Sequence, residues 1–168
     1  MLKYLTPQQY VEDIFAINIQ ELANSGIRVI LTDLDNTLVP WNSDQFTGEL
    51  QAWIGELKEK SFKICVVSNN SAKRGKDLIE ALDISAVWRA GKPGKRAYLK
   101  ALDTMGFKPS EAVMIGDQVF TDILGANRLG LYTILVKPIN NREFLFTKLK
   151  RPVEIFVLSI LKRRGALK

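Results

Sequence analysis

The feature that most constrains the fold of this chain is a regular alternation between short apolar runs and longer amphipathic segments. The runs are rich in β-branched residues and have the lengths typical of strands; they occupy residues 29–32, 63–67, 86–88, 112–115 and 131–136. Segments with helical spacing separate them at residues 46–60, 72–82, 94–105 and 120–129. Strands that alternate with helices pair in parallel, so the pattern predicts an α/β, Rossmann-like, doubly wound five-stranded sheet with helices on both faces.

The ends of the chain lie outside this alternation. Pro7 is followed by apolar residues at helical spacing, which predicts an N-terminal helix at about residues 8–24 that ends near Ser25-Gly26. Ser71 is a plausible cap for the helix at 72–82. We expect a domain over residues 1–141, with its core at 27–137, and a C-terminal extension over 142–168.

Composition excludes several kinds of chemistry. The chain has 168 residues, of which 46% are hydrophobic, enough for one domain with a sizeable core. Cys65 is the single cysteine, so no internal disulfide can form. The absence of histidine removes Ser-His-Asp and Cys-His nucleophile pairs and histidine-ligated zinc. No signal segment and no apolar run of about 20 residues is present, so we expect a cytoplasmic protein.

Polar residues follow four of the expected strands. The first strand runs into Asp33-Leu34-Asp35-Asn36-Thr37 and the second into Ser68-Asn69-Asn70. The third is followed by Gly91-Lys92-Pro93, and the fourth by Gly116-Asp117, with Asp122 five residues later. Because the carboxyl ends of parallel strands meet at one edge of the sheet, where ligands bind, these four segments are expected to converge.

The side chains in these segments suit phosphoryl transfer, which depends on positioning and on neutralising anionic oxygens. Asp33 and Asp117 are candidate ligands of Mg²⁺, which prefers oxygen ligands. Asp33 is the candidate nucleophile, and Asp35 the candidate acid that protonates the leaving oxygen and then the base that activates water. Ser68 is a candidate donor to the phosphate oxygens.

Lys92 is the candidate cation for the same phosphate oxygens. Two roles stay open for Asp122: reaching the metal through a water molecule, or pairing with Lys92 and fixing its direction.

The four segments resemble the four motifs of the haloacid dehalogenase (HAD) superfamily. The resemblance covers about residues 27–137 and implies that Asp33 is the nucleophile and Asp35 the general acid and base. It also implies that Asp33, the backbone carbonyl of Asp35, and Asp117 bind Mg²⁺. Ser68 and Lys92, with Asn69 beside them, would bind phosphate.

Over the whole chain, Asp33 to Trp41, Ser68-Asn69-Asn70 and Gly116 to Asp122 look most like the YqeG-type phosphatases of HAD subfamily IIIA. That group is similar to mitochondrial phosphatidylglycerophosphate phosphatases. One departure is that Gln118 follows Asp117, where many HAD phosphatases have two adjacent acids. The second acid is Asp122, whose role at the metal is therefore open.

The intervals between the motifs bear on the substrate. Only 30 residues separate Thr37 from Ser68, and 23 separate Ser68 from Lys92. Core elements use up both intervals, so the chain resembles a capless HAD enzyme, whose open site suits a large or membrane-bound phosphate ester or is covered by a second subunit. Phosphatidylglycerophosphate is the leading expectation for the substrate; a nucleotide, a sugar phosphate and a phosphoprotein are alternatives.

The net charge of +6 resides in the C-terminal extension. Residues 1–141 hold 16 basic and 16 acidic residues, whereas residues 142–168 hold 8 and 2. Phe144-Leu145-Phe146 and the apolar run at 153–161, flanked by cations, predict a basic amphipathic helix. Such a helix either packs on the domain or docks to an anionic membrane, which would make the protein peripheral at its inner face; contact with RNA or the ribosome is a third possibility.

Two functions from other classes compete with hydrolysis. A receiver-type signalling module also clusters aspartates, a hydroxyl and a lysine, but its acceptor aspartate lies on a later strand than its acidic pair. It also lacks an acid in the position of Asp35. A degenerate HAD scaffold used only for binding is disfavoured, because every catalytic residue type is retained.

Overall fold

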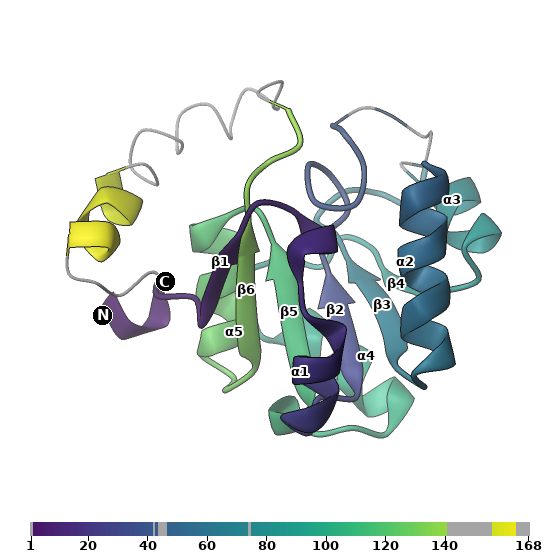
Figure 1. Cartoon of the computed structure of the whole chain (residues 1–168), viewed down its shortest axis with the longest axis horizontal. Coiled ribbons are helices and arrows are strands. Elements are labelled where there is room, and N and C mark those ends of the chain that lie inside the picture. Colours follow the sequence, from purple (N-terminus) through teal and green to yellow (C-terminus); the bar gives the residue numbers. More distant parts are fainter. Residues whose placement is uncertain (1, 42, 44–46, 74, 141–155, 164–168) are drawn as a thin grey trace.

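A computed structural model describes residues 2–41, 43, 47–73, 75–140 and 156–163. Its six strands form one parallel sheet in the order β1-β6-β5-β2-β3-β4 (Figure 1). The strands are β1 (Gln9–Val11), β2 (Val29–Thr32), β3 (Lys63–Val67), β4 (Ser85–Val87), β5 (Ala112–Gly116) and β6 (Tyr132–Val136). The α-helices are α1 (Ile19–Asn24), α2 (Gly48–Glu59), α3 (Lys76–Ala81), α4 (Arg96–Met105) and α5 (Leu124–Asn127). The doubly wound parallel architecture predicted from the alternation is confirmed.

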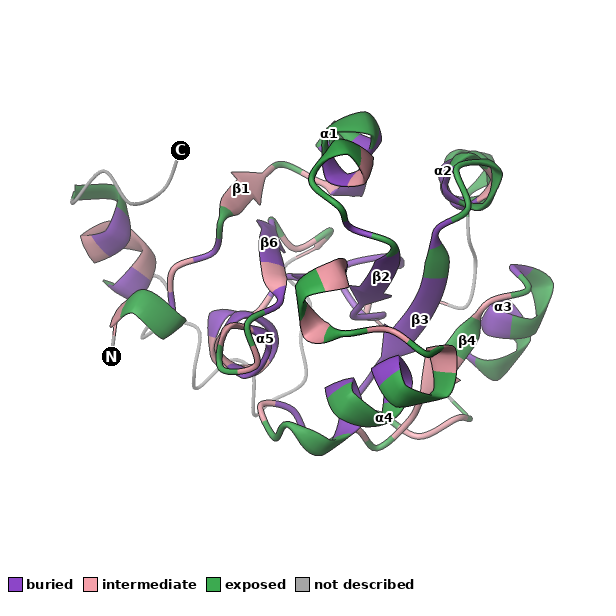
Figure 2. Cartoon of the chain, turned by 90° about the horizontal axis from the view of Figure 1, so that it is seen from below, coloured by how far each residue is buried: buried purple, intermediate pink, exposed green. Residues whose placement is uncertain are grey.

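Helices cover both faces of the sheet, with α1 and α2 on one face and α4 and α5 on the other (Figure 2). All four residues of β2 are buried, because β2 lies in the middle of the sheet between β3 and β5. Alternate side chains enter separate cores: Ile30 joins the cluster under α1 and α2, and Leu31 joins the cluster under α4. Burial on both faces explains the uninterrupted apolar runs in the sequence.

The prediction of one helix over residues 8–24 is wrong. Residues 9–11 form β1, which pairs with β6 at the edge of the sheet, and only α1 is helical in the α sense. The backbone N–H of Gln8 donates to Thr133 O at 2.9 Å, and its side-chain oxygen accepts from Thr133 N at 2.7 Å. Asp13 and Asn18 then cap a 3₁₀ turn and α1 separately. Pairing with a distant strand therefore overrides local helical spacing, and the sheet has six strands rather than five.

Two other helices differ from their expected bounds. The helix expected from residue 72 begins at Lys76, after Gly75, whose φ is +106°, so Ser71 is not its cap. The helix expected over 120–129 is a π-helical turn (Val119–Ile123) followed by α5. The 3₁₀ turns are η1 (Leu2–Tyr4), η2 (Ile14–Ala16) and η3 (Pro109–Glu111). The remaining predicted elements agree to within two residues.

The described part of the C-terminal extension packs on the domain. Residues 156–163 are helical, and Val157 and Leu161 are buried in a small cluster with Leu5 and Leu135. Lys162 Nζ lies 5.7 Å from the centre of the Tyr10 ring in β1. Residues 141–155 and 164–168, which include Phe144-Leu145-Phe146 and most of the cations, lie outside the described residues.

Among the described helices, none is long and apolar enough to cross a membrane. The intervals between motifs, as far as the structure describes them, contain α2 and β3, then α3 and β4, joined by turns. No inserted cap domain occurs in these described intervals, in agreement with the prediction.

Candidate active site

The register of the sheet brings three of the four motif segments to one edge. Thr32 at the end of β2 pairs with Val66 of β3 and Ile115 of β5. The three strands therefore end at the same edge of the sheet, and the residues that follow them are Asp33, Ser68 and Asp117. The backbone N–H of Asp33 still bonds to Ile115 O at 2.9 Å, which fixes the start of its loop. This carboxyl edge is the upper edge of the sheet in Figure 1.

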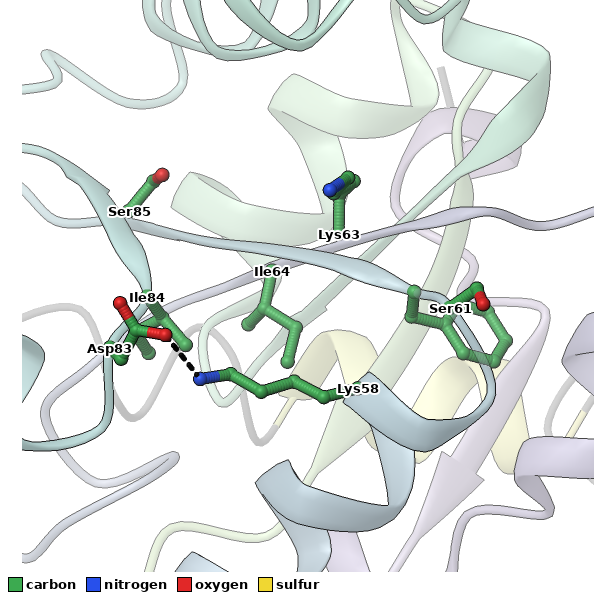
Figure 3. A pocket seen from close by; sticks show the side chains of 8 residues that line it. Lys58, Ser61, Lys63, Ile64, Asp83, Ile84 and Ser85 are labelled. Carbon is green, nitrogen blue, oxygen red and sulfur yellow. Dashed lines mark hydrogen bonds and ion pairs between the residues drawn. The ribbon is translucent and has the colours of Figure 1, made fainter.

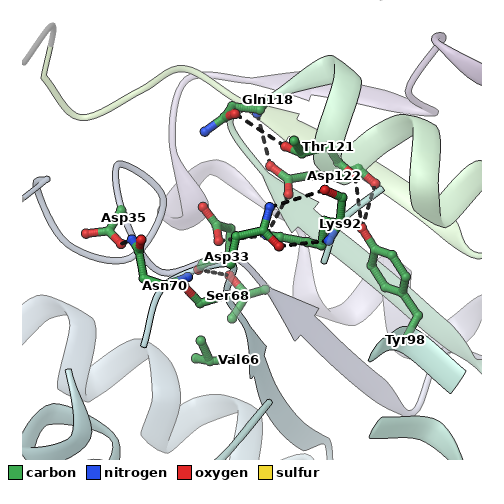
Figure 4. Close-up of polar contacts among 12 residues, drawn as sticks. Asp33, Asp35, Val66, Ser68, Asn70, Lys92, Tyr98, Gln118, Thr121 and Asp122 are labelled. Carbon is green, nitrogen blue, oxygen red and sulfur yellow. Dashed lines mark hydrogen bonds and ion pairs between the residues drawn. The ribbon is translucent and has the colours of Figure 1, made fainter. Parts of the chain in front are cut away.

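Lys92 lies between two aspartates in the centre of the site (Figure 4). Its Nζ is 2.7 Å from Asp33 Oδ1 and 2.7 Å from Asp122 Oδ1, and the three side chains are 2%, 10% and 0% exposed. Burial alone would lower the pKa of Lys92, but the charges of Asp122 and Asp33 outweigh burial and raise this pKa. Burial raises the pKa of Asp33, and Lys92 opposes that shift. The lysine thus stays charged and holds the Asp33 carboxylate in one direction.

The backbone of Lys92 is held by the second motif. Asn69 accepts from Lys92 N at 2.7 Å and donates through Nδ2 to Lys92 O at 3.2 Å. The side-chain amide of Asn69 is thus committed at both of its polar atoms. The role predicted for Asn69 as a phosphate contact stays a prediction; the contact that the structure shows is with Lys92.

The carboxylate of Asp122 is held close to the backbone of Gly116 and Gln118. Its Oδ2 accepts from Gln118 N at 3.1 Å, and a Cβ added to Gly116 would overlap the same oxygen. Only glycine at 116 leaves room for this carboxylate. Tyr98, buried in α4, donates to Thr121 O at 3.0 Å. This hydrogen bond links α4 to the π-helical turn that carries Asp122. Of the two roles open for Asp122, the structure shows the pairing with Lys92.

Three buried carboxylates are close enough to share a cation. Oxygen atoms of Asp33, Asp117 and Asp122 all lie within 4.8 Å of one another. Asp122 already has Lys92 on one oxygen and Gln118 N on the other. A set of carboxylate oxygens suits a hard cation such as Mg²⁺, so Asp33 and Asp117 fit the predicted metal, with Asp122 beside them.

Asp35 lies on the far side of Asp33 from Lys92, in a tight loop (Figure 4). Asn36 has a φ of +61° and its N–H donates to Val39 O at 2.7 Å, which turns the chain back on itself. Asn70 Nδ2 donates to Asp35 Oδ2 at 2.8 Å, and Asn70 N donates to Ser68 Oγ at 3.1 Å. The second motif therefore orients Asp35.

The structure brings together every site residue expected from the sequence: Asp33, Asp35, Ser68, Asn69, Lys92, Asp117 and Asp122. Sequence reasoning did not predict that Asn70, Gln118 and Tyr98 position other residues of the site. Asn70 stood beside Ser68-Asn69 and could have been included for its amide. Tyr98 offers no signal, because its place in α4 is that of an ordinary core residue.

Known proteins resemble this chain in sequence and in fold. The model of the haloacid dehalogenase-like hydrolase family matches residues 4–130. The chain is 41% identical to "Probable phosphatase YqeG" of Bacillus subtilis over 97% of this chain and 95% of that protein. It is 29% identical to the chloroplastic/mitochondrial phosphatidylglycerophosphate phosphatase 1 of Arabidopsis thaliana, over 96% of this chain; the match spans about half, 48%, of the plant protein.

Solved structures share the fold at low sequence identity. An uncharacterized protein from Listeria monocytogenes matches with a TM-score of 0.54 at 19% identity, over 79% of this chain and 99% of that one. A 3-deoxy-D-manno-octulosonate 8-phosphate phosphatase from Moraxella catarrhalis, solved with magnesium and phosphate ions, matches with a TM-score of 0.52 at 15% identity. That match covers 84% of this chain and 92% of the Moraxella chain.

Proposed function

The chain belongs to the haloacid dehalogenase-like hydrolase family and is a phosphatase, and from this premise we propose that it hydrolyses phosphomonoesters with Mg²⁺ through an aspartyl-phosphate at Asp33. One observation carries the proposal. Asp33 is held in one direction by buried Lys92, and its carboxylate lies within 4.8 Å of two further aspartates, a cluster that suits a cation able to neutralise phosphate oxygens.

The reaction would proceed in two displacements. A carboxylate oxygen of Asp33 forms a bond to phosphorus as the bond from phosphorus to the ester oxygen breaks, and Asp35 gives its proton to the leaving oxygen. Asp35 then takes a proton from water as that water attacks the phosphorus of the aspartyl-phosphate, which restores the Asp33 carboxylate. Asn70 keeps Asp35 in place for both proton transfers.

The remaining residues bind or position. Asp33, Asp117 and the backbone carbonyl of Asp35 would hold Mg²⁺, which when bound neutralises charge on the phosphate oxygens and on the nucleophile. We assign Asp122 a positioning role through Lys92, because its two oxygens already bond to Lys92 and to Gln118 N. Ser68 and Lys92 would contact the phosphate, and Asn69 would set the direction of Lys92.

For the substrate we propose phosphatidylglycerophosphate or another large or membrane-bound phosphate ester. Three features support this: the name of the plant relative, the capless core, and the basic composition of residues 142–168. A soluble metabolite is the second candidate, favoured by the sugar-phosphate phosphatase among the structural neighbours. A location in the cytoplasm, at the inner face of the membrane, stays a prediction.

The test of the mechanism is to trap the phosphorylated protein. With p-nitrophenyl phosphate and Mg²⁺, the unaltered chain should turn over; Asp33→Asn should lose at least about 10³-fold in kcat. Asp35→Asn should accumulate a phosphorylated chain that intact-mass spectrometry detects and that Asp33→Asn/Asp35→Asn does not form. Turnover that survives Asp33→Asn would contradict the nucleophile assignment.

The same measurements separate the competing functions. A stable phosphorylated chain without turnover in the unaltered protein would favour a receiver, and neither phosphorylation nor turnover would favour a binding scaffold. For the substrate, rates with phosphatidylglycerophosphate in mixed micelles should exceed those with soluble sugar phosphates and nucleotides. A preference for a soluble phosphate by orders of magnitude would remove the lipid proposal.

A further inference from the structure

A hollow lies next to the second and third motif segments. It has a volume of about 300 Å³ and is lined by Ser71, Ala72, Lys73, Trp88 and Arg89. None of these residues takes part in the chemistry proposed above. The hollow therefore raises the question of which part of a substrate it could contact.

The hollow is built from two of the four segments that form the site. Arg89 N donates to Asn70 O at 2.9 Å, and Ala90 N donates to Ser68 O at 3.0 Å, so the strand ends that carry Ser68 and Lys92 also carry the lining residues. Lys73 is three residues from Asn70, a span of at most about 11 Å. The hollow thus adjoins the segments that carry Ser68 and Lys92, so a substrate whose phosphate lies at Asp33 could extend into it.

The hollow is lined by two cations, Lys73 and Arg89, that are accessible to a ligand. Residues 84–102 contain five basic residues and no acidic one. Lys73 and Arg89 are both exposed, and within the described part of the chain neither has an ion-pair partner. Trp88 packs against the core beneath them and gives the hollow a fixed wall. Two unpaired cations beside a rigid wall suit an anionic group.

The backbone of Arg89 is in an uncommon conformation. Its φ is +50°, in the left-handed region that residues with a side chain rarely adopt. The hydrogen bond to Asn70 O and the one from Ala90 to Ser68 O hold it there. Strain of this kind is concentrated at functional sites, where the surrounding structure imposes it. Arg89 thus stands at a strand end that already belongs to the site.

We propose that Lys73 and Arg89 form a subsite for a second anionic group of the substrate, a phosphodiester separated by a short linker from the monoester that Asp33 attacks. This inference rests on the proposed phosphatase function and narrows its substrate class to diester-containing phosphomonoesters. Such a group occurs in the headgroup of phosphatidylglycerophosphate and in the free, deacylated headgroup.

The test compares two soluble substrates. The double variant Lys73→Gln/Arg89→Gln should lose about tenfold to a hundredfold in kcat/KM on the deacylated headgroup, glycerophosphoglycerol phosphate, mainly through KM. On glycerol 3-phosphate, which has the monoester alone, kcat/KM should change less than threefold. The matched control Lys63→Gln/Lys108→Gln removes the same charge from exposed lysines at the amino edge of the sheet and should leave both values unchanged.

The outcomes are distinguishable. An equal loss on both substrates, or the same loss in the control, would overturn the subsite and indicate general electrostatic attraction. A loss with phosphatidylglycerophosphate in micelles but not with its deacylated headgroup would overturn it in favour of membrane attraction. Normal turnover of glycerol 3-phosphate with no effect of the variant removes the subsite alone, whereas no turnover of any phosphate by the unaltered chain removes the proposed function as well. Lys73→Gln alone, on an exposed turn, keeps the test valid if the double variant unfolds.

Discussion

Lysines at the two edges of the sheet differ in burial and in the number of their ion-pair partners. At the carboxyl edge Lys92 is 2% exposed and lies 2.7 Å from both Asp33 and Asp122. At the amino edge Lys58 is 39% exposed and pairs with Asp83, itself 96% exposed, at 3.1 Å (Figure 3). The amino edge also has the larger hollow, about 570 Å³, against 300 Å³ for the hollow beside Arg89.

The difference shows that burial of charge, rather than the size of a hollow, distinguishes the site. An exposed pair such as Lys58 with Asp83 contributes about 0–1 kcal/mol and needs no further support. Buried charges lose their hydration and persist only when every partner is in place. At the carboxyl edge the residues that surround the buried charges come from four separate segments of the chain. At the amino edge the partner of Lys58 comes from one segment.

The sharpest way to break this comparison is to remove each lysine in turn. Lys92→Met leaves two buried carboxylates, Asp33 and Asp122, without their cation, so the free energy of unfolding in EDTA should fall by about 3–5 kcal/mol, and phosphatase activity should fall to background. Lys58→Met should change the free energy of unfolding by less than about 1 kcal/mol and leave activity intact. Urea unfolding followed by circular dichroism measures both. Equal destabilisation by the two variants would show that the edges do not differ as described.

A smaller change tests the close approach at the carboxyl edge. Gly116→Ala places a methyl group where Asp122 Oδ2 lies, so Asp122 must move away from Lys92. A displacement of about 1 Å can cost about 10²-fold in kcat, which steady-state rates with p-nitrophenyl phosphate would show. The matched control is Gly55→Ala in α2, where the added carbon meets nothing within 4 Å. It should keep full activity and stabilise the chain by about 0.5–1 kcal/mol.

The smallest expected effect concerns the cation. Mg²⁺ at ten times its dissociation constant should stabilise the folded chain by about 1.4 kcal/mol and raise the midpoint of thermal unfolding by about 3–6 °C. Asp117→Asn should abolish this rise, whereas Asp83→Asn at the amino edge should leave it unchanged. Thermal unfolding with and without EDTA is the measurement. A rise that persists in Asp117→Asn would contradict the assignment of Asp117 as a ligand.

Much of the fold could be predicted because β2, β3, β5 and β6 are buried on both faces and so carry continuous apolar runs. β1 could not, because each of its residues is half-buried at an edge and its strand state depends on pairing with β6, more than 120 residues away. The same holds for the π-helical turn at Val119–Ile123, which depends on where Tyr98 and Gly116 meet it.

The sequence by itself determined the parallel α/β architecture and the residue types at its carboxyl edge, because apolar runs and polar strand ends are local signals. Only the tertiary structure decided which of those residues touch. It places Lys92 between Asp33 and Asp122, Asn69 on the Lys92 backbone, and Asn70 on Asp35. These contacts join residues 23 to 59 positions apart, and their distances follow from strand register and packing, which no local pattern encodes.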